Sequence, residues 1–375
     1  MGPLSGIKVI EMGAIGPGPF CAMMLSDLGA EVIRVDRLSQ KGTGHRANVL
    51  HRGRRSIAID LKTPDGVDTL LKLIGNADCL IEGFRPGVME RLGLGPEICK
   101  DRNPQLIYGR MTGWGQSGPL STAAGHDINY ISIAGALGAM GYDDRPPAPP
   151  LNLIGDFGGG AMFLLTGLLA ALIERSSSGK GQIVDAAMTD GTAALLAPFF
   201  GLMAMGLWKK DRMSNKLDGG AHYYGSYECS DNKHISIGSI EPQFYALLLE
   251  RCGITDKVFD EQQDQVRWPL LREKLEALFI TKPRAYWCNL LEGTDVCFAP
   301  VLDLEEAPKH PHNIDRKTYI EKEGITQPAP APRFSRTQGK IQSAPATCGE
   351  HSEEILQNWG FTALEIANLK ENQII

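Results

Sequence analysis

Two ionisable side chains adjoin apolar segments in the middle of the chain. His126 lies in AGHDINYISIAG (residues 124–135), at the start of an apolar run with helical spacing. Asp156 lies in LNLIGDFGGG (residues 151–160), with no basic neighbour in the sequence and just ahead of glycines that let other groups approach closely. A histidine and a carboxylate facing one carbon atom can remove a proton and return it. The alternative is two separate polar residues, each satisfied within a large core.

Unpaired backbone amides are expected beside both residues. Each residue precedes a segment with helical periodicity, and the first amides of a helix have no partner inside it. Such amides stabilise a carboxylate at position 156, whereas burial raises its pKa. Amides after position 126 are placed to stabilise an oxyanion. With a ligand anchored by phosphates, these groups fit proton removal next to a carbonyl group.

A basic segment lies between residues 34 and 62. Its cations are Arg34, Arg37, Lys41, Arg46, Arg52, Arg54, Arg55 and Lys62, against only two aspartates. Several cations flank predicted strands, and Arg85 follows another strand, so in a parallel sheet we expect them to gather at one edge and bind phosphates. A solvated basic face is the alternative. GAIGPGPFCA (residues 13–22) predicts a tight turn, because its prolines remove amides and the spacing is not GxGxxG.

Glu241 and the remaining histidines and cysteines give weaker signals. Glu241, in SIGSIEPQF, ends a β run, where it either begins a helix or orients a histidine. Five histidines in polar or linker segments form no metal-spaced set: His222, His234, His310, His312 and His351. The eight cysteines contain no CxxC pair. We therefore expect neither a metal site nor a disulfide framework.

Strands and helices alternate over the first half of the chain. The β-rich runs are 7–13, 31–37, 56–62, 78–84 and 106–115. Between them lie helical segments such as 63–77, in which Thr63 is the N-cap and Pro64 the first helical residue. This alternation predicts an α/β fold with a doubly wound, parallel, Rossmann-like sheet that binds ligands at the carboxyl ends of its strands. Residues 220–307 read as two antiparallel strands, helices and a further strand, which predicts a small α+β domain.

Composition limits the class of protein. With 375 residues, 43 % of them hydrophobic, the chain can bury a core and form about two domains. A net charge of −6 argues against a general nucleic-acid-binding protein. The apolar segment 158–174 is short and rich in glycine, which predicts a buried helix and no membrane span. The sequence shows no signal peptide, and its last residues, ENQII, do not match a peroxisomal signal. We therefore expect a cytoplasmic protein with reduced thiols.

Motifs along nearly the whole chain point to one family. They include DLGAEVIRVDR, RRSIAIDLK, ADCLIEGFRPGVMERLGLGPE, LIYGRMTGWGQSGP, AGHDINY, SGKGQIVDAAM, LDGGAHYY and PAPRFSRT. In these motifs the chain resembles the racemases of the family III CoA-transferase superfamily, which interconvert (2R)- and (2S)-2-methylacyl-CoA thioesters. The resemblance implies an isomerase without a metal or redox cofactor, in which coenzyme A is part of the substrate.

The resemblance also implies an interlocked homodimer. It divides the chain into a large CoA-binding domain (1–190), a linker (191–219), a small domain (220–307), a second linker (308–335) and a segment that returns to the large domain (336–375). The acyl end of the substrate is expected at the subunit junction. No nucleic-acid or membrane partner is expected.

By resemblance, four residues carry the chemistry. His126 removes the α-proton of the S substrate and Asp156 that of the R substrate, and the other residue returns a proton to the opposite face through an enolate. Asp127 donates its amide to the thioester oxygen, and Glu241 pairs with His126. The substrate and its CoA part are expected to contact Arg37, Ala58, Ile59, Asp60, Leu61, Lys62, Gly83, Arg85, Arg91, Ala124, Gly125, Ile128, Asn129, Tyr130 and Asn152.

CoA-transferases of the same superfamily are the nearest alternative. They use the aspartate that matches Asp156 as a nucleophile, lack the histidine that matches His126, and carry a glycine-rich loop in the small domain. His126 is present and SIGSIEPQF has no glycine run, so the sequence favours a racemase. A catalytically inactive CoA-ester-binding protein is the third interpretation.

The acyl chain stays open between a branched fatty acyl group, a sterol side chain and an arylpropionyl group. FFGLMAMGLW (residues 199–208) is rich in methionine and phenylalanine. It either accommodates such tails, since methionine adapts its shape, or forms helix core.

Overall fold

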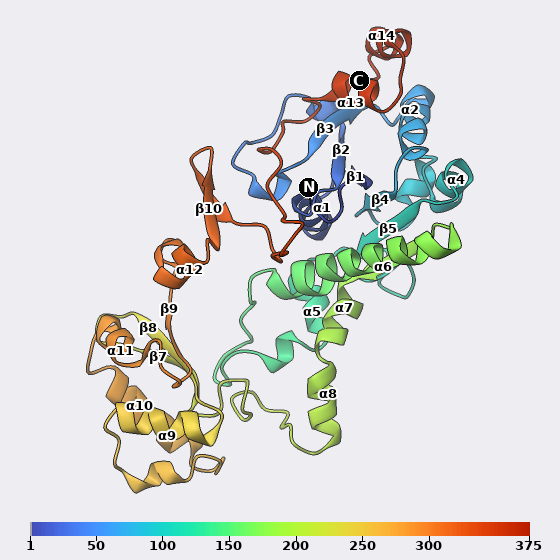
Figure 1. Cartoon of the computed structure of the whole chain (residues 1–375). Coiled ribbons are helices and arrows are strands. Elements are labelled where there is room, and N and C mark those ends of the chain that lie inside the picture. Colours follow the sequence, from blue (N-terminus) through green and yellow to red (C-terminus); the bar gives the residue numbers. More distant parts are fainter. Residues whose placement is uncertain (1) are drawn as a thin grey trace. The chain divides into compact units, whose positions relative to one another are not determined.

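The computed structural model describes residues 2–375, which form two compact units. The first, called here the sheet unit, contains the residues up to Ala134 together with Pro150–Leu195 and Lys317–Ile375. The second, the small unit, contains Gly135–Pro149 and Leu196–Arg316. The chain therefore leaves the sheet unit and returns to it, so both ends belong to the same unit (Figure 1).

A six-stranded parallel sheet forms the centre of the sheet unit. Its strands are β1 (Lys8–Met12), β2 (Glu31–Arg37), β3 (Arg55–Ile59), β4 (Cys79–Glu82), β5 (Ile107–Thr112) and β6 (Ile183–Ala187). They lie in the order β3-β2-β1-β4-β5-β6, and every neighbouring pair is parallel. The winding direction changes between β1 and β4, where the carboxyl ends of strands open a crevice in folds of this kind. The predicted doubly wound α/β fold is confirmed.

Helices cover both faces of this sheet. One face carries α2 (Pro64–Ile74), α4 (Pro96–Arg102), α13 (Ser352–Asn358) and α14 (Ala363–Glu371), and the other carries α1 (Pro17–Asp27) and α6 (Met162–Ser178). Successive strand residues point to opposite faces, so Val9 packs beside α1 and α6 while Ile10 packs beside α2. Thr63 begins α2 as predicted, because its Oγ1 accepts the amide of Gly66 at 3.1 Å.

Asp156 lies in a π-helix, Leu153–Ala161, that continues into α6. The sequence predicted a regular buried helix at 158–174, whereas the α-helix begins only at Met162 and ends at Ser178. Helix α7 (Met188–Leu195) lies directly against the π-helix backbone. A Cβ on Gly159 would lie only 2.6 Å from Thr192 Oγ1, so the glycines are required by this close approach.

The combined helix Leu153–Ser178 has the length and mean hydropathy (1.7) of a membrane span. Within the sheet unit, however, Leu164 and Leu168 are fully buried in the core formed with the strands. Only 39 % of the most apolar window of this helix is buried, and Ile173 is exposed, so the predicted burial is found only in part.

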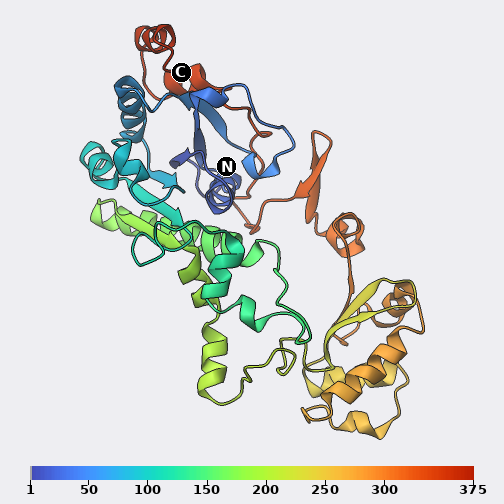
Figure 2. The same cartoon turned by 180° about the vertical axis from the view of Figure 1, so that it is seen from behind.

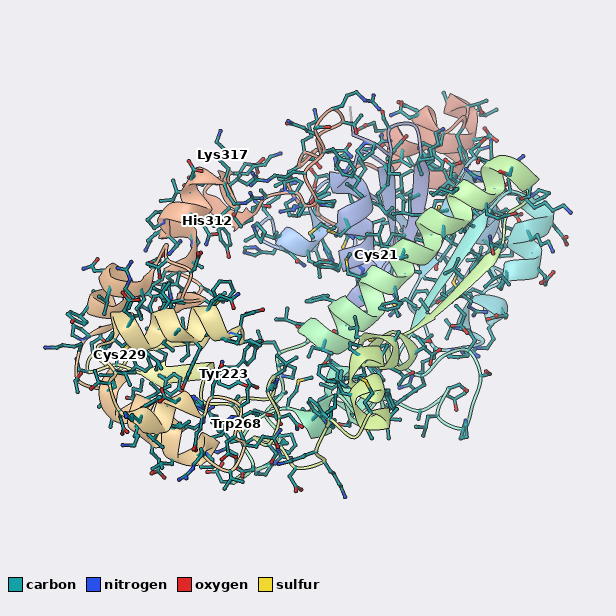
Figure 3. The ribbon with its side chains drawn as sticks, turned by 60° about the horizontal axis from the view of Figure 1, so that its bottom comes forward. Cys21, Tyr223, Cys229, Trp268, His312 and Lys317 are labelled. Atoms are coloured by element: carbon teal, nitrogen blue, oxygen red, sulfur yellow. The ribbon has the colours of Figure 1, made fainter. Side chains whose placement is uncertain are left out.

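The small unit has a core of its own around an antiparallel sheet. Its strands are β7 (Tyr224–Glu228), β8 (His234–Gly238) and β9 (Phe298–Val301), and its main helices are α8 (Ala197–Ala204), α9 (Pro242–Arg251), α10 (Trp268–Phe279) and α11 (Arg284–Leu291). The rings of Tyr223 and Trp268 meet edge to face with centroids 5.8 Å apart (Figure 3). The predicted antiparallel pair, helices and later strand are all present.

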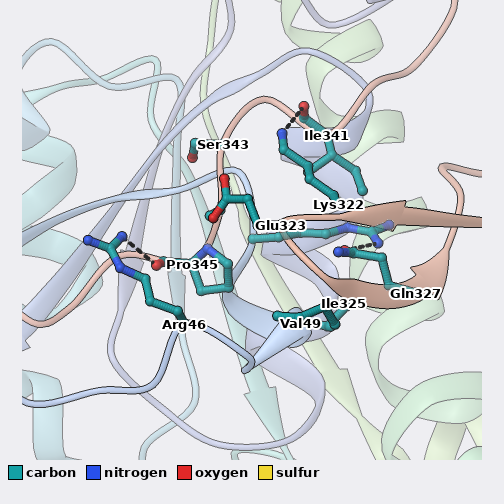
Figure 4. Close-up of a pocket in the computed structure, with 11 residues that line it drawn as sticks. Arg46, Val49, Lys322, Glu323, Ile325, Gln327, Ile341, Ser343 and Pro345 are labelled. Carbon is teal, nitrogen blue, oxygen red and sulfur yellow. Dashed lines mark hydrogen bonds between the residues drawn. The ribbon is translucent and has the colours of Figure 1, made fainter.

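The C-terminal part of the chain packs against the edge strand β3 (Figures 1 and 2). After helix α12 (Pro311–Asp315), the hairpin β10 (Tyr319–Lys322) and β11 (Ile325–Pro328) adjoins the loop before β3. A cavity of about 10 Å³, room for one water molecule, lies between the hairpin, this loop and the segment 341–345 (Figure 4). Further along, the amide of His351 donates to the carbonyl of Ser56 at 2.9 Å.

Candidate active site

His126 is the N-cap of a short helix, α5 (Asp127–Ile133), and its side chain is exposed. Its amide donates to Asn129 Oδ1 at 3.0 Å, which fixes the backbone at the start of the helix. The preceding carbonyl, of Gly125, accepts a hydrogen bond from the buried Tyr130 hydroxyl. The Tyr130 ring in turn meets Trp114 edge to face, with centroids 4.7 Å apart. The histidine is therefore presented by a rigid, aromatic-backed turn.

Asp156 is half-buried and lies near His126. Burial raises the pKa of its carboxyl, Asp127 adds to the rise, and the Asn152 hydrogen bond and the charge of His126 act in the opposite direction. Asn152 Nδ2 donates to Asp156 Oδ2 at 2.9 Å. The structure thus brings the two predicted acid–base residues into one electrostatic environment within the sheet unit.

Asp127 and Gly16 complete the surroundings of Asp156. Asp127 is buried, and its Oδ1 accepts the amide of Asp156 at 2.7 Å. A Cβ on Gly16, in the turn before α1, would lie 3.1 Å from Asp156 Oδ2. The predicted tight turn is found at residues 13–16, whereas residues 17–22 already belong to α1. Nothing in the sequence indicates that this turn faces Asp156, because the contact joins segments far apart in the chain.

Most of the predicted basic cluster is not available to a ligand. Arg34, Arg52 and Arg54 are buried and paired with Asp36, Asp27 and Glu11 at 2.8, 2.5 and 2.5 Å. The expectation that Arg52 and Arg54 bind phosphates is therefore wrong, because each neutralises a carboxylate that the fold has removed from water. Arg46 and Arg55 also form ion pairs, with Glu350 and with both Glu31 and Glu354.

Five other predicted cations are exposed and form no ion pair within residues 2–375: Arg37, Lys41, Lys62, Arg85 and Arg91. Arg37 ends β2, Lys62 follows the end of β3, and Arg85 follows the end of β4. The carboxyl ends of parallel strands meet at one edge of a sheet. Arg37, Lys62 and Arg85 are therefore exposed cations at this edge, where a phosphorylated ligand can reach them.

Arg110, on β5, bonds the segment after β4 that carries Arg85 and Arg91, in which Val88–Arg91 forms the short helix α3. Arg110 Nε donates to Glu82 Oε1 at 2.8 Å, and its Nη1 donates to Glu90 Oε1 at 2.8 Å. Glu82 Oε2 accepts the amide of Phe84 at 2.7 Å, so one carboxylate bonds both the arginine and the loop backbone. Sequence reasoning missed this group. Its signal was a glutamate at the end of an otherwise apolar strand, in CLIE.

The remaining predicted CoA-site residues differ in exposure. Ala58 and Ile59 are buried, and the Ala58 amide already donates to Ser352 Oγ at 3.2 Å. Asp60 and Leu61 are partly exposed, and the Asp60 amide donates to the carbonyl of Ile374 at 2.9 Å. Exposed backbone or side chain is found at Gly83, Ala124, Ile128, Asn129 and Asn152. Because Ala58 and Ile59 are buried, a ligand can contact these two residues only through atoms at the rim of the sheet.

Glu241 lies in the small unit, as the N-cap of α9, with an exposed side chain. Burial raises the pKa of the nearby Cys297 thiol, and the Glu241 carboxylate raises it further. No group of three His, Cys, Asp or Glu side chains within residues 2–375 is arranged to hold a metal ion. The eight cysteines are free thiols.

Comparison with known proteins gives a consistent result. Residues 4–352 match the family described as CoA-transferase family III. The chain is 45 % identical to an alpha-methylacyl-CoA racemase of Mus musculus and 43 % identical to one of Homo sapiens, in each case covering 99 % of this chain and 97 % of the relative. A succinyl-CoA–D-citramalate CoA-transferase of Chloroflexus aurantiacus is 30 % identical, covering 100 % and 98 %.

Solved structures show the same architecture. A CAIB/BAIF family protein from Brucella suis superposes with a TM-score of 0.82 at 28 % identity, covering 96 % of this chain and 100 % of that one. A hypothetical protein from Mycobacterium tuberculosis superposes with a TM-score of 0.79 at 27 % identity, covering 95 % and 99 %.

Proposed function

The chain belongs to CoA-transferase family III, and we propose that it is a racemase of 2-methylacyl-CoA thioesters. Relatives at 43–45 % identity over almost the full length are alpha-methylacyl-CoA racemases. The single observation that carries the proposal is the 2.7 Å hydrogen bond from the Asp156 amide to Asp127, the residue next to His126, which supports placing the two acid–base groups in one site. Burial raises the pKa of the Asp156 carboxyl. A raised pKa makes a carboxyl group a better proton donor partner for a base on the opposite face of the substrate.

Racemisation requires one proton-transferring group on each face of the α-carbon. In the S direction, neutral His126 takes the α-proton, the electron pair of the C–H bond moves into an enolate, and protonated Asp156 delivers a proton to the opposite face. In the R direction, ionised Asp156 takes the proton and protonated His126 returns one. Each turnover therefore exchanges the protonation states of the two residues.

The enolate oxygen needs a hydrogen-bond donor. Asp127 is the first residue of α5, and its amide has no partner inside the helix. We assign this amide to the thioester oxygen, where the loss of one such donor costs about 10²–10³ in rate. These proton transfers require neither a metal nor a redox cofactor, because the thioester itself acidifies the α-proton.

Substrate binding is assigned to the exposed cations at the carboxyl edge of the sheet. Arg37, Lys62, Arg85 and Arg91 supply positive charge for the phosphates of coenzyme A. We further propose a homodimer in which the acyl group reaches the subunit junction, with Glu241 as the partner of His126.

A CoA-transferase is the second candidate, because a relative at 30 % identity is one. In that reaction Asp156 would attack the thioester and form an acyl anhydride. One epimer of a 2-methylacyl-CoA in D₂O separates the candidates. Deuterium at C2 with loss of optical purity supports the racemase. CoA transfer to an added carboxylate without exchange supports the transferase. The absence of both results supports a CoA-ester-binding protein.

A further inference from the structure

The two acid–base residues are held in place by different side chains. The Asp127 carboxylate accepts the amide of Asp156 at 2.7 Å, whereas Asn129 accepts the amide of His126 at 3.0 Å. We propose that Asp127, through its carboxylate, is the positioning residue of Asp156, and that Asn129 is the positioning residue of His126. This inference rests on the proposed racemase function, and it concerns side chains that act on another residue rather than on the substrate.

The Asp127 carboxylate is built into the fold. Asp127 is only 7 % exposed, and the Asp156 amide is the one hydrogen-bond donor to it within residues 2–375. That amide belongs to the first turn of the π-helix, where backbone donors have no partner inside the helix. Asp127 Oδ1 and the Asp156 amide therefore satisfy each other, as in a helix cap, whereas the buried Asp127 Oδ2 has no donor within residues 2–375.

The packing leaves no room for the π-helix to move closer. A Cβ on Gly155 would lie 2.5 Å from Asp127 Oδ1 and 3.0 Å from Ile131 Cγ2. The backbone that precedes Asp156 thus rests directly on α5. If the carboxylate is removed, nothing else in the described chain bonds this amide, so the Asp156 backbone can shift relative to the substrate.

Asn129 has a role beyond the predicted contact with the substrate. Its Oδ1 bonds the His126 amide at the helix start. Removing that acceptor frees the His126 backbone while leaving the contact between Asp127 and Asp156 intact. The two variants Asp127→Ala and Asn129→Ala therefore form a matched pair with opposite expected effects.

The readout is exchange of the α-proton with D₂O, measured separately from each pure epimer of a 2-methylacyl-CoA. Exchange without inversion needs only the residue that faces the proton. Misplacement by about 1 Å can cost about 10²-fold in rate. For Asp127→Ala we expect the ratio of R exchange to S exchange to fall at least about tenfold below that of the unmodified protein. For Asn129→Ala we expect the ratio to rise.

The ratio isolates positioning from folding. Both exchange rates come from the same sample, so the fraction of folded enzyme cancels, as does any change at the Asp127 amide that faces the enolate oxygen. Asp127→Asn keeps an oxygen acceptor and should keep the ratio close to the original. Gly155→Ala pushes the backbone away from an intact Asp127 and should lower the ratio of R exchange to S exchange as Asp127→Ala does. It replaces Asp127→Ala in the test if the Asp127→Ala protein fails to fold.

Two failures are distinguishable. If the unmodified protein exchanges neither epimer, the proposed racemase function is wrong, and the positioning inference falls with it. If the unmodified protein exchanges both, but Asp127→Ala and Gly155→Ala lower both rates equally, the racemase stands and Asp127 is a merely structural residue.

Discussion

Removal of the Arg110 guanidinium should destabilise the sheet unit and weaken binding of the CoA part. Arg110 bonds Glu82, whose side chain is fully buried, and Glu90, which is on the loop that carries Arg85. Removing one partner of a buried ion pair costs about 3–5 kcal/mol, because the other charge stays buried without compensation. For a unit of this size we expect Arg110→Met to lower Tm by about 6–20 °C.

The pH dependence of this loss follows from Glu82. Burial already raises the pKa of its carboxyl, while the Phe84 amide and Arg110 oppose the rise. Without Arg110 the folded-state pKa rises further above the unfolded value. Protonated Glu82 then favours the folded state at low pH, and this stabilisation is lost as pH rises through the folded-state pKa. The loss of unfolding free energy in Arg110→Met, relative to the unmodified protein, should therefore be larger at pH 8 than at pH 5.

Calorimetry on the full chain and steady-state kinetics test this prediction together. The second substitution Glu82→Gln should recover part of the Tm lost in Arg110→Met, because it removes the uncompensated charge. In kinetics, KM for the acyl-CoA should rise more than kcat falls. Arg267→Met is the matched control, since its ion pair with Glu261 is about half-exposed and worth about 1 kcal/mol or less. Equal effects of the two arginine variants on Tm and KM would refute this reasoning.

Three further outcomes are expected. Arg85→Ala should raise KM for the acyl-CoA at least about tenfold, as the loss of a charge-assisted bond predicts. Arg46→Ala, which removes the partner of Glu350, should leave KM nearly unchanged. Equal KM values of the two variants would contradict the assignment of phosphate-binding cations. Asp156 must be ionised to remove the proton of the R epimer, and its pKa is raised. As the pH is lowered, the rate of this step should therefore begin to fall at a pH above about 3.9, the pKa of an ordinary aspartate. A rate that stays constant from pH 7 to pH 4 would contradict this prediction. Thr362→Ala, which removes the cap of α14, should cost about 1 kcal/mol in unfolding experiments without changing KM, and a change in KM would show that α14 acts on the site.

The strands could be predicted from the sequence because burial dictates side-chain pattern locally. Residues 31–37 alternate between two faces and form β2 at the predicted bounds, and Thr63 with Pro64 marks the start of α2. The π-helix could not be predicted in the same way. Gly155 is explained by its close approach to Asp127 of α5, and Gly159 by its close approach to Thr192 of α7, and both partners lie about thirty residues away in the chain.

Site residues were predictable as chemical types but not as environments. Arg52 and Arg37 look alike in sequence, yet one neutralises the buried Asp27 and the other ends β2 in solvent. Burial of a charge depends on which segment covers it, and the cover of this edge comes from the C-terminal residues. Sequence motifs indicated that His126 and Asp156 act together. The hydrogen bond by which the Asp127 carboxylate joins their two elements could not be predicted, because it connects residues far apart in the chain.

The central claim is that two residues each serve one face of the α-carbon. The most direct measurement is made on His126→Ala and Asp156→Ala, each incubated in D₂O with either pure epimer, following both optical purity and deuterium at C2. The account predicts that both variants lose racemisation, while His126→Ala still exchanges the R epimer and Asp156→Ala still exchanges the S epimer. A variant that keeps most of its racemisation, or the reverse pattern of exchange, would contradict the two-base mechanism as assigned.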